Sequence, residues 1–131
     1  MLAQQLLTPE NQDMMKDIIS YLEKKGFTEI KADIEEYERP TRLLRKNSDD
    51  IFIPNITASK SNSKHYFEIV PKGKDTDGKM VSKLTTLSAL AGMKGGKLCL
   101  IVPNGKLRYT NQLLEDNRQI EAEVLPMKAI Q

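Results

Sequence analysis

The sequence predicts an α/β domain with a mixed central sheet and helices on both faces. Segments with apolar residues at helical spacing alternate with short runs rich in β-branched and aromatic residues, in the order α-β-β-β-α-β-α-β. The run Leu98–Val102 is apolar without alternation, which is typical of a strand covered on both faces. A chain of 131 residues fits one hydrophobic core, so we expect a single domain over residues 1–131.

The first helix and the first strand follow from the N-terminal third of the chain. Thr8, Pro9 and Glu10 form a helix start, with a capping hydroxyl, a proline at the first helical position and an acid in the first turn. Apolar residues then recur at helical spacing up to Gly26, which predicts a helix over 9–25. Residues 27–34 alternate weakly and are interpreted as a strand. Residues 35–50 are charged and have no clean period, which indicates a connection.

The middle and the end of the chain predict a hairpin followed by two helix–strand units. Residues 51–59 and 64–70 are two strand-like runs around a polar turn at 60–63. A loop rich in glycine and aspartate precedes a helix with apolar residues from Met80 to Ala91. The buried strand at 98–102 follows, and then a helix around 106–116 and a short strand around 120–125.

Composition excludes several classes of protein. No apolar run approaches the roughly 20 residues that span a bilayer, so we expect no membrane association. The N-terminus lacks a basic segment followed by a long apolar stretch, so we expect no secretory signal. The single cysteine, Cys99, excludes an internal disulfide and a cysteine-based zinc site. The expected location is cytoplasmic.

Positive charge is concentrated in the middle of the chain. Residues 39–106 carry 13 Lys/Arg against 5 Asp/Glu, a balance of +8, whereas residues 1–38 carry 4 against 9. Basic side chains that converge on one face neutralise phosphates and release counterions, and the same charges spread over several faces form an ordinary lysine-rich surface. Both readings stay open. The candidate residues for binding nucleic acid are Arg39, Arg42, Arg45, Lys46, Lys74 and Lys79.

One carboxylate, Glu68, lies inside the apolar run at 66–70 and needs an explanation. The element order, with Pro54 and Asn55 on one hairpin strand and Glu68 on the next, resembles the restriction-endonuclease-like PD-(D/E)xK nuclease superfamily, which includes Holliday-junction resolvases. The resemblance implies a restriction-endonuclease-like fold. It also implies that an acid after the proline and an acid on the following strand bind Mg²⁺, that a lysine two residues later assists, and that a glutamate on the first helix sometimes joins them.

The match to this motif is partial. Pro54 and Glu68 fit, but Asn55 stands where the family has aspartate, and Val70 stands where it has lysine. An amide oxygen is neutral, and Mg²⁺ gains much of its affinity from anionic oxygens. The resemblance therefore implies Glu68, Asn55 and Glu10 as metal ligands only if the site is functional.

The catalytic candidates are Glu68, Lys72 and Lys83, with either lysine replacing the one missing at position 70. Each of these residues also has an ordinary reading: an acid on a solvated strand face for Glu68, and surface charges for Lys72 and Lys83. Glu10 is equally an acid that favours the helix dipole. His65 and Cys99 are interpreted as structural residues.

Two functional hypotheses remain. The first is a degenerate, non-catalytic module on this fold that binds DNA, RNA or a protein partner through its basic middle segment. The second is a weak or rearranged Mg²⁺-dependent nuclease or resolvase that uses Glu68 with Glu10, Asn55 and one of the two lysines. The altered positions 55 and 70 favour the first hypothesis, in which no cofactor is needed.

Overall fold

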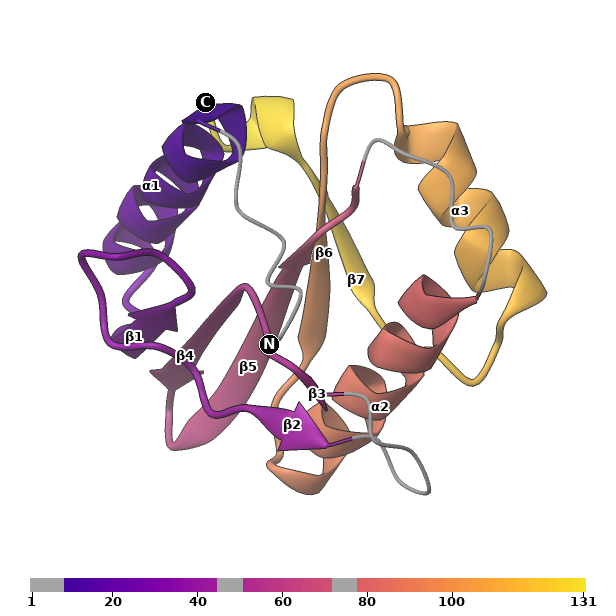
Figure 1. Cartoon of the computed structure of the whole chain (residues 1–131), viewed down its shortest axis with the longest axis horizontal. Helices are drawn as coiled ribbons and strands as arrows, with labels where there is room; N and C mark the ends of the chain where they lie inside the picture. The colour runs from indigo at the N-terminus through magenta and orange to yellow at the C-terminus, as the bar shows by residue number, and fades with distance from the viewer. Residues whose placement is uncertain (1–8, 45–50, 72–77) are drawn as a thin grey trace.

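The computed structural model describes residues 9–44, 51–71 and 78–131. Its core is a five-stranded mixed sheet with the strand order β1-β4-β5-β6-β7, accompanied by a two-stranded sheet of β2 and β3 (Figure 1). The elements in chain order are α1 (Pro9–Lys24), β1 (Thr28–Ala32), β2 (Leu43–Leu44), β3 (Ile51–Phe52), β4 (Ile56–Lys60), β5 (Ser63–Ile69), α2 (Lys79–Met93), β6 (Leu98–Val102), α3 (Leu107–Asp116), β7 (Glu123–Pro126) and the 3₁₀ turn η1 (Met127–Ala129). The predicted α/β class is confirmed.

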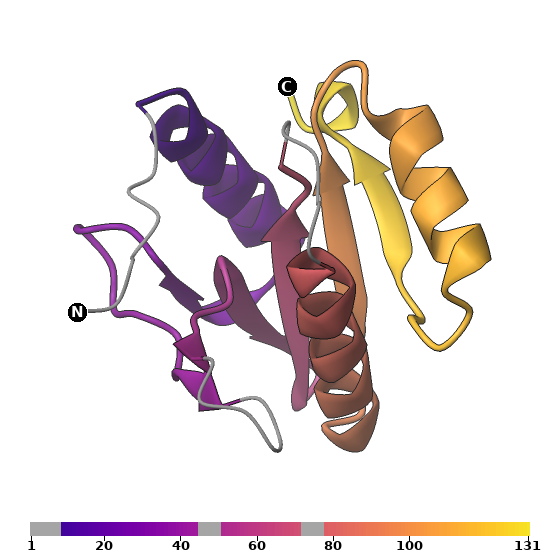
Figure 2. The ribbon, with the colours of Figure 1, turned by 45° about the vertical axis from the view of Figure 1, so that its right-hand side comes forward.

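The helices cover both faces of the sheet, as predicted. On one face, the apolar side of α1 packs against Ala32, Ile56 and Phe67. On the other face, α2 and α3 pack against Tyr66, Val70 and alternate residues of β6. Figure 2 shows α1 on the opposite side of the sheet from α2 and α3. None of the helices in the described ranges is long and apolar enough to cross a membrane.

The sheet combines an antiparallel meander with two parallel crossovers. Strand β4 pairs antiparallel with β1 on one side and with β5 on the other. Strand β6 pairs parallel with β5, and β7 pairs parallel with β6. The parallel connections pass through α2 and α3, because parallel neighbours need a long crossover. The β4–β5 turn is shorter than predicted: Lys60 pairs with Ser63, and Ser61 and Asn62 both have positive φ, at 54° and 65°, as in a tight two-residue hairpin turn.

The structure corrects the predicted strand over 51–59. The segment splits into β3, which pairs with β2, and β4, which begins only at Ile56. Pro54 lies at the break, and proline has no N–H to donate to a sheet. Pairing with β3 also places a short strand, β2, inside the segment that was interpreted as a connection.

Strand β6 lies in the interior of the sheet, between β5 and β7, as its apolar sequence predicts. Four of its five residues are buried, and the fifth, Cys99, is partly buried. Leu84 and Leu87 of α2 are buried in the same cluster as Leu98 and Leu100, with Met80 packed against it. The buried strand therefore anchors β5, the strand that carries Glu68.

Candidate functional site

Glu68 is a buried residue on β5. Its side chain lies on the same face as those of Tyr66 and Val70, because alternate residues of a strand share a face. Glu68 is only 3% exposed, so the reading of a carboxylate on a solvated strand face is wrong. A charge at this depth requires partners.

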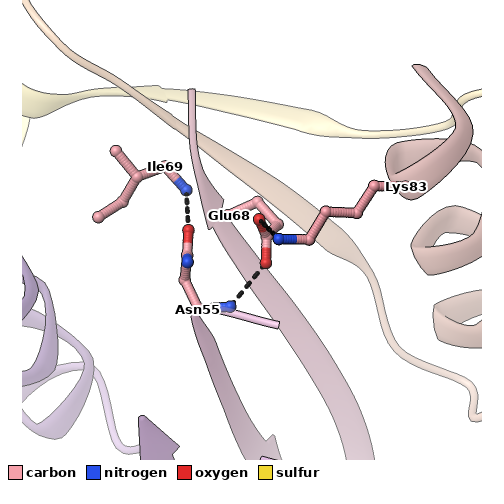
Figure 3. A network of polar contacts seen from close by, with 4 residues as sticks. All are labelled: Asn55, Glu68, Ile69 and Lys83. Atoms are coloured by element: carbon pink, nitrogen blue, oxygen red, sulfur yellow. Dashed lines mark hydrogen bonds and ion pairs between the residues drawn. The ribbon is translucent and has the colours of Figure 1, made fainter. Parts of the chain in front are cut away.

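The partners of Glu68 come from the bend just before β4 and from α2 (Figure 3). Its Oε1 accepts a hydrogen bond from the backbone N–H of Asn55 at 2.6 Å. Its Oε2 lies 2.9 Å from Nζ of Lys83, which projects from α2. Both carboxylate oxygens are thus bound to N–H donors, and among the described residues no buried side-chain nitrogen or oxygen lacks a partner.

Asn55 connects this network to the sheet ladder. Its Oδ1 accepts the backbone N–H of Ile69 at 2.8 Å (Figure 3). The next amide, that of Val70, donates to Ile101 on β6, so the Ile69 amide faces the β4 side, where the last ladder pair is Ile56 with Phe67. The Asn55 side chain therefore supplies an acceptor one step beyond the end of the β4–β5 ladder. Asparagine at this position has a structural role.

Burial and the two N–H donors of Glu68 have opposite effects on its pKa. Burial raises the pKa of Glu68, whereas the charge and hydrogen bond of Lys83 and the N–H of Asn55 lower it. Lys83 is itself only 24% exposed in its side chain, and its Nζ lies 5.6 Å from the centre of the Phe52 ring on β3. Lys83 is therefore a partly buried partner of Glu68, and the reading of it as a solvated surface lysine is wrong.

Asp33 is a neighbour of this site that the sequence did not reveal. Its negative charge also raises the pKa of Glu68, and its backbone N–H donates to the carbonyl of Asn55 at 2.9 Å. Its carboxylate lies 3.4 Å from a guanidinium nitrogen of Arg39. The only sequence signal was an acid near the end of the strand predicted at 27–34, and the pairing of that strand with β4 is what brings the acid close.

The donor set, as arranged, does not fit a divalent cation. Mg²⁺ takes anionic and carbonyl oxygens that face an open position. Here the oxygens of Glu68 and the side-chain oxygen of Asn55 all accept N–H groups. Within the described ranges no three His, Cys, Asp or Glu side chains gather at one point. A cation at Glu68 would have to displace the ammonium of Lys83.

The structure brings together three of the predicted site residues: Glu68, Asn55 and Lys83. Glu10 lies in the first turn of α1, and its side chain is outside the described part of the structure. Residues Lys72, Arg45, Lys46 and Lys74 lie outside the described residues.

The remaining basic candidates do not converge on Glu68. Arg39 contacts Asp33 and donates to the carbonyl of Ile34, Arg42 is exposed before β2, and Lys79 is exposed at the start of α2.

The side chains of His65 and Cys99 pack against other residues, in line with the interpretation of both as structural residues. The His65 ring packs edge-on against Phe27, with 5.3 Å between ring centres. Burial raises the pKa of the Cys99 thiol to about 12, with a further contribution from the charge of Glu123. A thiol of this kind is protonated at neutral pH and is a poor nucleophile.

Comparison with known proteins yields a structural likeness and no family. No family model matches the sequence, and no curated protein matches it. Among solved structures, the crystal structure of protein VC1899 from Vibrio cholerae is similar, with a TM-score of 0.58 and 13% sequence identity over 89% of this chain. The match covers 29% of the Vibrio chain, so this chain corresponds to less than a third of that protein. At this identity the likeness concerns the fold alone.

Proposed function

We propose that this chain is a non-catalytic module, related in fold to the PD-(D/E)xK nucleases, that binds nucleic acid or a protein partner through its basic middle segment. One observation carries the non-catalytic part of the proposal. The carboxylate that corresponds to the nuclease acid, Glu68, is bound on one oxygen by the Asn55 N–H and on the other by Lys83.

The order of elements supports a relation to that superfamily. A helix, an antiparallel meander, a crossover helix and a parallel strand follow one another. In the proposed relation, Asn55 and Glu68 are the counterparts of the two acids of the family motif. The amide at 55 and the apolar Val70, which is buried against α2, remove one acid and the usual lysine. Loss of a ligand charge and of a group that stabilises developing negative charge each lower catalytic rates strongly.

A second candidate function has one observation in its favour. Lys83 reaches Glu68 from α2, the helix that follows the hairpin, and so provides an ammonium where Val70 provides none. A rearranged, weak nuclease would use this lysine beside Glu68, with Asp33 as a further acid nearby. The ion pair would have to open before any cation could bind, which makes this function the weaker candidate.

The test is a metal titration combined with a cleavage assay on the intact chain. Isothermal titration with Mg²⁺ and with Mn²⁺ is expected to give no saturable binding at millimolar metal, and duplex, branched and single-stranded DNA should stay intact. Glu68→Gln is compared with Glu115→Gln, which removes an exposed carboxylate on α3. Cleavage or saturable metal binding that disappears in Glu68→Gln and persists in Glu115→Gln would establish the nuclease in place of the module.

A further inference from the structure

One end of the sheet collects lysines from four elements. The lysines lie on the last residue of β4, at the start of β5, in the α2–β6 loop and on β1. Figure 1 shows the β4–β5 turn and the α2–β6 loop at the same end of the sheet. The α2–β6 loop lies next to the start of β5. A Cβ built onto Gly95 of this loop would lie 3.5 Å from Oγ of Ser63. We call these lysines the turn-end cluster: Lys60, Lys64, Lys94 and Lys97 next to the turn, on both faces of the sheet, and Lys31 further along β1, opposite Thr57.

Strand pairing places most of these lysines next to the turn: Lys60 pairs with Ser63, Lys64 pairs with Ser59, and the carbonyl of Lys97 accepts the N–H of Tyr66 at 2.9 Å. Partial burial lowers the pKa of Lys64, and the charges of Lys31 and Lys94 lower it further. The pKa of His65 on the other face of β5 is lowered by burial and by the charges of Lys97 and Lys60. Positive charge therefore surrounds both faces of β5 next to the turn.

Two members of the cluster form ion pairs with carboxylates. Lys31 pairs with Glu38 at 3.2 Å, and Lys97 pairs with Glu123 at 3.3 Å. No carboxylate in the described part of the chain lies within ion-pair distance of the other three, which are Lys60, Lys64 and Lys94.

Aromatic rings hold two of the three unpaired ammonium groups. Nζ of Lys60 lies 5.1 Å from the centre of the Phe27 ring, and Nζ of Lys64 lies 5.4 Å from that of Tyr66. A cation over a ring loses less side-chain freedom when an anion arrives, because its position is already restricted. The ring contacts leave the positive charge itself uncompensated.

We propose that the turn-end cluster, through Lys60, Lys64 and Lys94, binds the phosphate backbone of a nucleic acid without reading its sequence. Several unpaired ammonium groups around one turn match a ligand that presents a regular series of anionic groups. The exposed Ser61 and Asn62 between them add hydrogen-bond donors of the kind that contact phosphate oxygens.

This surface is separate from the Glu68 network. Lys64 and Glu68 lie on the same strand and the same face, four residues apart, which corresponds to about 13 Å along β5. The inference rests on the proposed binding function. It names the partner and assigns the contact to Lys60, Lys64 and Lys94 instead of Arg39 and Arg42, which the sequence had suggested.

The experiment measures binding of short fluorescent duplex and single-stranded DNA by anisotropy over a range of salt concentrations. The variant Lys64→Gln/Lys94→Gln is compared with Lys106→Gln/Arg108→Gln, which removes the same charge near the start of α3. At about 50 mM salt we expect each cluster lysine that contacts a phosphate to contribute roughly tenfold in affinity, and its loss to reduce the salt slope by about 1. The control variant should bind nearly as the wild type does.

The outcomes separate this inference from the proposed function. Equal losses in the two variants would mean that net charge alone drives binding and would overturn the inference. If Arg39→Gln/Arg42→Gln weakens binding and the cluster variant does not, the inference fails while nucleic-acid binding by the basic segment stands. Polyglutamate that competes as well as DNA at equal charge would instead identify a site for acidic polypeptides. No DNA binding by the wild type overturns the inference and leaves the metal and cleavage tests of the non-catalytic reading unaffected.

Discussion

Replacing Lys83 by methionine tests whether Glu68 is a buried, charged group held by its partners. Methionine keeps the length of the aliphatic chain and removes the charge. Glu68 would then retain one donor, the N–H of Asn55, in a position where its side chain is only 4% exposed. Removing one partner of a buried ion pair costs about 3–5 kcal/mol, and the partial exposure of Lys83 places the expected loss near the lower end, at about 3 kcal/mol.

The loss should depend on pH in a direction that the pKa of Glu68 fixes. Burial raises this pKa above its usual value of 4.5, and Lys83 opposes the rise, so the pKa rises further in Lys83→Met. The folded variant then binds more protons than the unfolded chain between pH 4.5 and the raised pKa. Its free energy of unfolding must therefore fall as pH increases through that window. The destabilisation relative to the wild type should be largest at neutral pH and shrink toward pH 4.5.

Urea denaturation followed by circular dichroism, at pH 7.5 and at pH 5, measures both effects. The double variant Glu68→Gln/Lys83→Met provides the control, because it removes both charges and should recover most of the stability that Lys83→Met loses. A loss below about 1 kcal/mol for Lys83→Met at neutral pH, the same loss at both pH values, or no recovery in the double variant would refute the picture of a buried charge pair.

Three further predictions concern the scaffold. Gly96→Ala should lower the free energy of unfolding by about 3 kcal/mol, because its Cβ would overlap the carbonyl oxygen at the start of β5, whereas Gly92→Ala, on an open face of α2, should raise it by about 1 kcal/mol; thermal melts compare the two. Cys99 should react with iodoacetamide at pH 8 far more slowly in the folded protein than in urea, since raising its pKa from 9.0 to about 12 lowers the thiolate fraction by about 1,000-fold; equal rates would contradict its burial. Asn55→Ala should cost about 1–3 kcal/mol in urea unfolding because it leaves the Ile69 N–H without its acceptor, and an unchanged midpoint would remove the structural role of the amide.

The fold could be predicted from sequence because its signals are local. The helical spacing from Met14 to Leu22 and the unbroken apolar run at 98–102 each indicate which residues are buried. The polar turn at 60–63 predicts that the strands on either side of it pair with each other. The break at Pro54 is also local, and its consequence for strand pairing is not. Residues 51 and 52 pair with β2, and no local feature of the sequence indicates that partner.

The candidate site was only partly predictable, because its chemistry depends on contacts between distant segments. The sequence identified Glu68, Asn55 and Lys83 as residues of interest and gave alternatives for each. It did not show that the lysine would bind one carboxylate oxygen while the Asn55 backbone binds the other, or that Asp33, just after β1, would lie nearby. Each of these facts requires the pairing of strands and the position of α2 to be known.

The role of the asparagine at position 55 follows from the same contacts. An aspartate there would add a negative charge close to Glu68 and Asp33, and such a group of acids needs a cation to be stable. With asparagine, the side-chain oxygen serves the Ile69 N–H and the backbone N–H serves Glu68, so the ammonium of Lys83 is the only further donor that the carboxylate shows in the described residues. The asparagine at position 55 and the Glu68–Lys83 pair therefore fit one another: with no second carboxylate at position 55, the protein's own lysine balances the buried charge of Glu68.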